Sequence, residues 1–198
     1  MTQVIVFDVG GVILKIDHNL SFRVLQDYGV PSDIAAQFFK IEYAAFSRGE
    51  ISEDEFFNAV NRRLQIPLSA EQLLDAYNAR TYGVDGQVVD LLEKIPAQNL
   101  AILTDTTVLQ TRRERELIDL SRFSPRVFRS CEIHKLKPDA DCFPYVRDQI
   151  GAQPDELVMV DDSLDKLVFA QRDGWHTIHF RDAEQLRMEL AQHFPTPR

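Results

Sequence analysis

The residues that could carry chemistry in this chain stand directly after apolar runs. They are Asp8 after residues 3–7, Thr104 and Asp105 at and after the end of 100–104, Lys137 in the loop after 127–131, and Asp161 with Asp162 after 157–160. If these runs are parallel strands of one open sheet, their carboxyl ends share an edge, and ligands bind at that edge. We therefore expect these side chains to converge on one site.

Crowded carboxylates repel one another and raise each other's pKa values. A hard divalent cation removes this conflict, and Mg²⁺ commonly combines one or two carboxylates with water and substrate phosphate. Lys137 and Thr104 could then hold the phosphate as a point charge and a hydrogen-bond donor. A carboxylate such as Asp8 can also attack phosphorus and form an aspartyl-phosphate. Gly10 and Gly11 behind it allow the backbone to approach closely and leave a carbonyl free for the metal.

The apolar runs predict a parallel sheet. Five strands are expected, at residues 3–7, 100–104, 127–131, 157–160 and 176–180. Helical patterns at 88–95, 143–151 and 164–174 lie between them, and two of these end on a glycine. Strands that alternate with helices predict βαβ units, in which helices cover both faces of the sheet. The fold class is therefore α/β.

Residues 15–84 have a different sequence pattern, with aromatic-rich helical periodicity and no convincing strand. Ser52 with Glu55, and Ser69 with Gln72, have the spacing of capping boxes, in which a serine and an acid or amide three residues later close a helix start. We interpret this segment as a helical insertion, the cap. Residues 1–14 and 85–198 then form the core.

Length, charge and cysteine content limit the class of protein. A chain of 198 residues fits one domain with an insertion. The formal net charge of −9 argues against non-specific binding to nucleic acid or to anionic membranes. Two cysteines make no disulfide framework, so we predict a reducing, cytoplasmic location. The sequence contains no stretch of 18 consecutive apolar residues, so we predict no membrane-spanning helix.

Four motifs, FDVGGVIL, ILTDT, LKPDADCF and VMVDDS, occur in this order over nearly the whole chain. Together they resemble the haloacid dehalogenase-like hydrolase superfamily, in a subgroup with a small helical cap and a Gly-Gly first motif, some members of which resemble sugar-phosphate phosphatases. The resemblance implies a Rossmann-like core with a helical cap after the first motif. The roles it implies are nucleophile and metal ligand for Asp8, metal ligand for the Gly10 carbonyl, phosphate binding for Thr104 and Lys137, direct metal ligand for Asp162, and ligand directly or through water for Asp161.

Three positions depart from the pattern of that superfamily. Gly10 stands where most of its phosphatases have a second aspartate, which protonates the leaving group. Such acid–base catalysis is worth roughly 10²–10⁴-fold, so we expect slow turnover or substrates with good leaving groups, such as anomeric or acyl phosphates. Asp105 replaces a commoner neutral residue and is the candidate to supply the missing acid. Lys166 replaces a frequent asparagine, which bears on support of the metal site.

The leading hypothesis is an Mg²⁺-dependent phosphatase that acts on a small phosphorylated metabolite through an aspartyl-phosphate. Tyr43, Phe46 and Arg48 of the cap are candidates to line the substrate pocket, and His134, close to Lys137 in sequence, is the one histidine worth testing. One alternative is a haloacid dehalogenase with the same aspartate nucleophile, a reaction that needs no leaving-group acid. The other is a non-catalytic member that binds a phosphate ligand.

Overall fold

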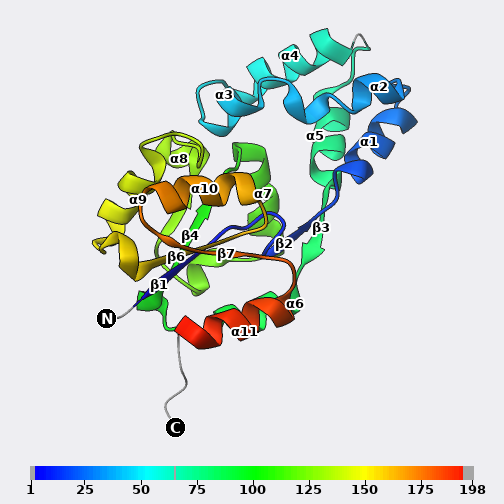
Figure 1. Ribbon diagram of the computed structural model, residues 1–198. Coiled ribbons are helices and arrows are strands. Elements are labelled where there is room, and N and C mark those ends of the chain that lie inside the picture. The colour runs from blue at the N-terminus through cyan, green and yellow to red at the C-terminus, as the bar shows by residue number, and fades with distance from the viewer. Residues whose placement is uncertain (1–2, 65, 194–198) are drawn as a thin grey trace.

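A five-stranded parallel sheet forms the centre of the protein, as seen in the computed structural model, which describes residues 3–64 and 66–193 (Figure 1). The strands are β1 (Val4–Phe7), β4 (Leu100–Thr104), β5 (Val127–Arg129), β6 (Leu157–Asp161) and β7 (His176–His179), in the order β5-β4-β1-β6-β7. All five predicted strands are confirmed. β1, β4 and β6 are buried along their whole length, which explains the apolar runs that make up all but the last residue of β4 and β6.

The order of the strands places a switch point in the middle of the sheet. From β1 the chain builds β4 and β5 on one side, then returns to build β6 and β7 on the other. A crevice opens where strand order reverses, at the carboxyl ends of the strands on either side. The loops that follow β1, β4 and β6 therefore meet at one edge.

Helices cover both faces of the sheet, as predicted. One face carries α6 (Gly86–Leu92) and α11 (Ala183–His193), and the other carries α9 (Cys142–Ile150) and α10 (Leu164–Arg172). Successive side chains of a strand point to opposite faces, so Ile5 and Phe7 of β1 pack under α6 and α11, whereas Val4 and Val6 pack under α9 and α10. Two further helices, α7 (Val108–Leu117) and α8 (Ser130–Ile133), follow β4 and β5.

The helices of the inserted segment stand apart from the sheet (Figure 1). They are α1 (His18–Asp27), α2 (Ser32–Ala35), α3 (Tyr43–Ser47), α4 (Glu53–Leu64) and α5 (Ala70–Ala79). Their apolar side chains form a separate core, to which α7 contributes Leu109. Both predicted capping boxes are present: the Ser52 and Ser69 hydroxyls accept from the backbone N–H of Glu55 and Gln72, whose side chains accept from the serine N–H groups.

Two short strands, which the sequence analysis did not predict, join the cap to the core. β2 (Leu14–Ile16) and β3 (Thr81–Val84) pair antiparallel, with Leu14 opposite Val84. They escaped detection because strands of three and four residues are too short to establish a period of two, and Gly83 is poor at forming strands. The chain thus enters the cap through β2 and leaves it through β3, and the two strands form one paired ribbon. The expectation of no strand between residues 15 and 84 is wrong.

Two expectations from composition can be compared with the fold. Cys131 and Cys142 are both buried free thiols, which confirms that they form no disulfide. Among the residues that the structure describes, none of the helices combines the length and apolar character that crossing a bilayer requires.

Candidate active site

Three carboxylates converge where β1 and β6 end. Phe7 pairs with Val160, so Asp8 and Asp161, one residue further along each strand, lie side by side, and Asp162 follows. One oxygen from each of the three carboxylates lies within 4.8 Å of the others. Asp8 and Asp161 are buried, whereas Asp162 is exposed. The structure therefore brings together these three carboxylates from the strand ends.

Lys137 lies within this cluster and is completely buried. Its Nζ is 2.8 Å from Asp8 Oδ1 and 2.5 Å from Asp161 Oδ2, so one ammonium group bridges two carboxylates. The backbone N–H of Lys137 donates to Asp105 Oδ1 at 2.9 Å, which fixes the loop against the end of β4. The lysine that sequence analysis assigned to phosphate thus reaches the proposed nucleophile directly.

Burial and neighbouring charges act in opposite directions on the pKa values here. Burial alone would raise the pKa of Asp8, but the positive charges of Lys137 and Lys166 hold it below its usual range. For Asp161, burial and the Asp8 charge raise the pKa to about 6 despite the contact with Lys137. Burial likewise raises the pKa of Asp162. Fully ionised carboxylates are therefore costly in this cluster unless further positive charge is supplied.

The donor set fits Mg²⁺. With Asp105, four carboxylates meet two lysine ammonium groups, so the fully ionised cluster carries two uncompensated negative charges. Mg²⁺ would balance these charges and prefers oxygen ligands. Asp8 and Asp162 would hold it directly, with Asp161 beside them. Among the described residues nothing donates to the Gly10 carbonyl, which leaves that oxygen available as a further ligand.

The two glycines after Asp8 differ in what they require. Gly11 has φ +83°, and a Cβ there would lie only 2.1 Å from Asp162 Oδ2. Gly11 is therefore needed both for its backbone conformation and for the approach of Asp162. Among the described residues, a Cβ at Gly10 would have only Ile16 within 4 Å, at 3.7 Å. The missing second aspartate is therefore not explained by a lack of space for its Cβ.

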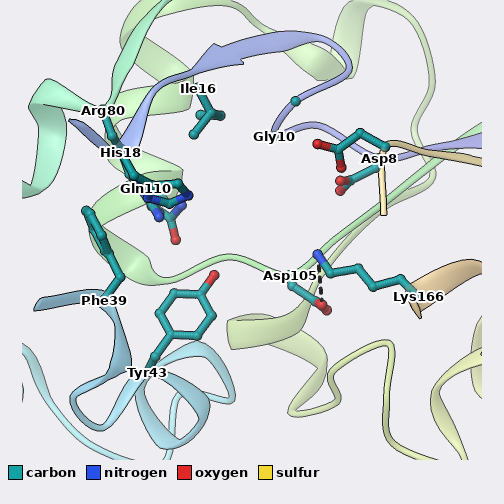
Figure 2. A pocket seen from close by; sticks show the side chains of 12 residues that line it. Asp8, Gly10, Ile16, His18, Phe39, Tyr43, Arg80, Asp105, Gln110 and Lys166 are labelled. Carbon is teal, nitrogen blue, oxygen red and sulfur yellow. Dashed lines mark ion pairs between the residues drawn. The ribbon is translucent and has the colours of Figure 1, made fainter. Parts of the chain in front are cut away.

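A cavity of about 290 Å³ lies between this cluster and the cap. Figure 2 shows Asp8 and Lys166 on one side of it and residues of the cap on the other. The residues lining the cavity come from both parts of the chain: Asp8, Gly10, Gly11, Asp105, Gln110, Asp162 and Lys166 from the core, and Ile16, His18, Phe39, Tyr43 and Arg80 from the ribbon and the cap. The carboxylate cluster thus opens into a space large enough for a small molecule.

The family model of the haloacid dehalogenase-like hydrolases matches residues 2–172, most of the chain. The chain belongs to this family. The sesquiterpene phosphatase astK of Aspergillus oryzae is 24% identical to this hydrolase over 190 residues, 94% of each chain.

Two solved structures show the same fold. A HAD family enzyme from Bacteroides thetaiotaomicron, in complex with magnesium and inorganic phosphate, superposes with a TM-score of 0.82 at 20% identity, covering 91% of this chain and 95% of that one. A predicted HAD-like family hydrolase from Porphyromonas gingivalis gives 0.82 at 23% identity over the full length of both chains. These likenesses confirm the α/β fold that the sequence predicted for this hydrolase.

Of the three cap residues expected to line the substrate pocket, only Tyr43 faces the cavity of the hydrolase (Figure 2). Phe46 is 1% exposed and stacks on Phe56 with ring centroids 4.3 Å apart, inside the cap core. Arg48 makes a bidentate ion pair with Asp139 in the loop after Lys137, at 2.6 and 2.9 Å. Phe46 therefore stabilises the cap and Arg48 joins the cap to the core, so both pocket assignments are wrong.

Three other assignments acquire a definite geometry. Thr104 is buried at the end of β4, and its hydroxyl has no hydrogen-bond partner among the described residues, so it is available to a ligand. Asp105 lines the cavity, but its oxygens lie against the Lys137 N–H and, at 3.4 Å, the Lys166 Nζ. These contacts make Asp105 an anchor of the loop that carries Lys137. His134 donates from Nδ1 to the Arg48 carbonyl at 2.7 Å and does not line the cavity.

Sequence analysis missed the part of the cavity wall formed by His18, Phe39, Arg80 and Gln110. None of these belongs to a motif. Gln110 could have been found only as the third residue of a capping box with Thr107, a box that the structure contains. Arg80 directly precedes β3, and its place on the cavity follows from the ribbon, which the sequence pattern did not predict.

We expect Gly11→Ala to weaken Mg²⁺ binding by roughly 10–100-fold, the range seen when a metal ligand loses its support. The added methyl would collide with the Asp162 carboxylate and displace it. The left-handed backbone adds strain of about 1–2 kcal/mol. Calorimetric titration with Mg²⁺ measures the affinity. Gly29→Ala is the matched control, because Gly29 has φ +89° and a Cβ there would meet no atom of the described residues within 4 Å. Unchanged Mg²⁺ affinity in Gly11→Ala would contradict the prediction.

Proposed function

We propose that this hydrolase is an Mg²⁺-dependent phosphatase that hydrolyses a small phosphomonoester through an aspartyl-phosphate on Asp8. The observation that carries the proposal is the position of the Lys137 ammonium between Asp8 and Asp161, directly behind Asp8, which itself lines the cavity between the core and the cap. The relatives support it, since one is a sesquiterpene phosphatase and another was solved with magnesium and inorganic phosphate.

The chemistry follows from the placement of each group. A carboxylate oxygen of Asp8 attacks phosphorus opposite the ester oxygen, and the bond from phosphorus to that oxygen breaks. Lys137 and the Thr104 hydroxyl bind the phosphoryl oxygens, on which charge is spread in the transition state. Bound at the three carboxylates, Mg²⁺ would supply further positive charge to the same oxygens. Water then hydrolyses the aspartyl-phosphate and releases inorganic phosphate.

The absence of an acid at Gly10 bears on the choice of substrate. Asp105 is held by the Lys137 N–H and lies 3.4 Å from the Lys166 ammonium, so its contacts do not favour the donation of a proton to a leaving oxygen. We infer that the hydrolase acts best on phosphate esters whose leaving groups depart without protonation. Phenyl and acyl phosphates should therefore be turned over far better than simple alkyl phosphates.

A screen of phosphate esters with Mg²⁺ tests the proposal. We expect release of inorganic phosphate from aryl phosphates and loss of roughly 10²–10⁴-fold in rate on chelation, the effect of several kcal/mol of charge stabilisation. Chloride release from 2-chloropropionate in the presence of chelator would instead favour a dehalogenase. Dehalogenation requires no leaving-group acid, so it is compatible with glycine at position 10. Tight Mg²⁺ and phosphate binding without turnover of any ester would favour a non-catalytic role.

A further inference from the structure

Arg80 is a buried cation without a carboxylate partner in the part of the chain that the structure describes. Its side chain is almost entirely buried, since the residue is 3% exposed, and neither Nε nor Nη2 has a hydrogen-bond partner among the residues that the structure describes. The guanidinium instead lies over two aromatic rings, with its central carbon 4.4 Å from the Phe39 centroid and 5.1 Å from that of Tyr77. Arg80 also lines the cavity that opens onto Asp8.

This arrangement is unfavourable unless a ligand completes it. Burying a charged group without a hydrogen-bonded counter-charge is among the most costly arrangements in a protein. The aromatic faces attract the cation and the Tyr77 hydroxyl accepts a hydrogen bond from its side chain, but neither supplies a counter-charge. Another buried arginine of this chain shows the usual solution, because Arg129 Nη2 donates to Glu114 Oε1 at 2.6 Å. Arg80 has no such partner among the described residues and borders an open space.

The groups beside Arg80 add further donors. Gln110 Oε1 already accepts from the Tyr77 hydroxyl and the Thr107 N–H, and its amide nitrogen has no partner among the described residues. The Asp17 carboxylate, whose backbone N–H donates to the Arg80 carbonyl, accepts from Asn19. Figure 2 shows Arg80, His18 and Gln110 together on the side of the cavity opposite Asp8 and Lys166. This wall therefore offers hydrogen-bond donors and positive charge to whatever enters.

We propose that Arg80, assisted by Gln110, binds a second anionic group of the substrate, at the end remote from the transferred phosphoryl group. The inference rests on the proposed function and narrows its substrate class to small phosphate esters that carry a carboxylate or a second phosphate. The guanidinium suits either anion, because its planar set of N–H donors matches the oxygens of both. Phe39 and Tyr43 line the wall between the two charged ends and suit a flat or apolar middle portion.

Non-hydrolysable phosphonates test this assignment in the full-length protein with Mg²⁺. The probes are 4-carboxyphenylphosphonate and its neutral match, 4-carbamoylphenylphosphonate, with 1,4-benzenediphosphonate as the second anionic probe. Calorimetry gives the dissociation constants. We expect wild type to bind at least one anionic probe roughly tenfold or more tightly than the amide, the size expected for a charge-assisted hydrogen bond. Which of the two anions binds better decides between a carboxylate and a phosphate.

The variants identify the residue responsible. Arg80→Met should reduce the ratio of the amide and anionic-probe dissociation constants to near one, and Arg80→Lys should keep part of the preference. Arg62→Met removes an exposed cap arginine and should leave the ratio unchanged. The inference would be overturned if the amide dissociation constant of wild type were less than about twice that of the anionic probes. It would also be overturned if Arg80→Met kept the wild-type ratio of the two constants. Hydrolysis of phenyl phosphate separately tests the proposed function, because phosphonate binding requires no turnover.

Discussion

Replacing Asp8 with asparagine will lower kcat for every ester that the wild-type hydrolase turns over by roughly 10⁴–10⁶-fold, the effect that loss of a key group in a covalent catalytic unit has in other enzymes. The amide keeps the shape of the side chain, but a neutral amide oxygen is a poor nucleophile. Asp8 is 3% exposed, and the charge of Lys137 holds the pKa of its carboxyl below the usual range, so the wild-type side chain is ionised at neutral pH.

Two measurements check this expectation. Steady-state kinetics with Mg²⁺ give kcat, and mass spectrometry of acid-quenched reactions detects a phosphorylated peptide containing Asp8 in wild type only. Asp155→Asn is the matched control, because Asp155 is exposed and precedes β6, at the end of the strand remote from the site. An Asp8→Asn variant that retains activity within tenfold of wild type would exclude the covalent route.

Replacing Lys137 with methionine will abolish turnover and also destabilise the fold by about 3–5 kcal/mol, the cost of removing one partner from a buried ion pair. Lys137 is completely buried between Asp8 and Asp161, and methionine fills the space without supplying charge. For a chain of this length the loss corresponds to a melting temperature lower by roughly 10 °C. Urea unfolding measures the free energy.

Mg²⁺ distinguishes electrostatic from packing effects in this variant. If lost charge is the cause, Mg²⁺ will restore more stability to Lys137→Met than it adds to wild type, because it neutralises the same carboxylates, whereas activity will stay absent. Lys135→Met is the control: Lys135 pairs with Asp141, whose side chain is 66% exposed, and such pairs contribute about 0–1 kcal/mol. Equal effects of Mg²⁺ on both lysine variants would contradict the electrostatic explanation.

The sheet could be predicted because its strands carry local signals. β1, β4 and β6 are apolar up to the polar residue that ends β4 and β6, since helices cover both of their faces. Parallel strands also place their carboxyl ends at one edge, so a polar residue after each strand predicts a shared site without any knowledge of the loops. Asp8, Asp161 and Asp162 were found in this way, and the structure brings them together.

The cap wall of the cavity could not be predicted, because it depends on contacts between residues far apart in sequence. Tyr43 and Phe46 lie one helical turn apart, yet only Tyr43 reaches the cavity, because Phe46 stacks on Phe56 of another helix. The partner of Arg48 is Asp139, in a loop of the core. Arg80 shows the same limit: its isolation from carboxylates is visible only once every neighbouring side chain has a position.

Arg48 ties the cap to the loop that carries Lys137. The Arg48 guanidinium donates to Asp139, which also accepts from the Leu136 N–H. The backbone carbonyl of Arg48 accepts from His134. The paired strands β2 and β3 connect the cap to the core at a second place. The cap is therefore held at two places, the ribbon and the Arg48–Asp139 ion pair. Any movement that separates α3 from the core must break the contacts of Arg48 with Asp139 and His134, close to Lys137. The position of α3 and the order of the loop that carries Lys137 are therefore coupled through Arg48.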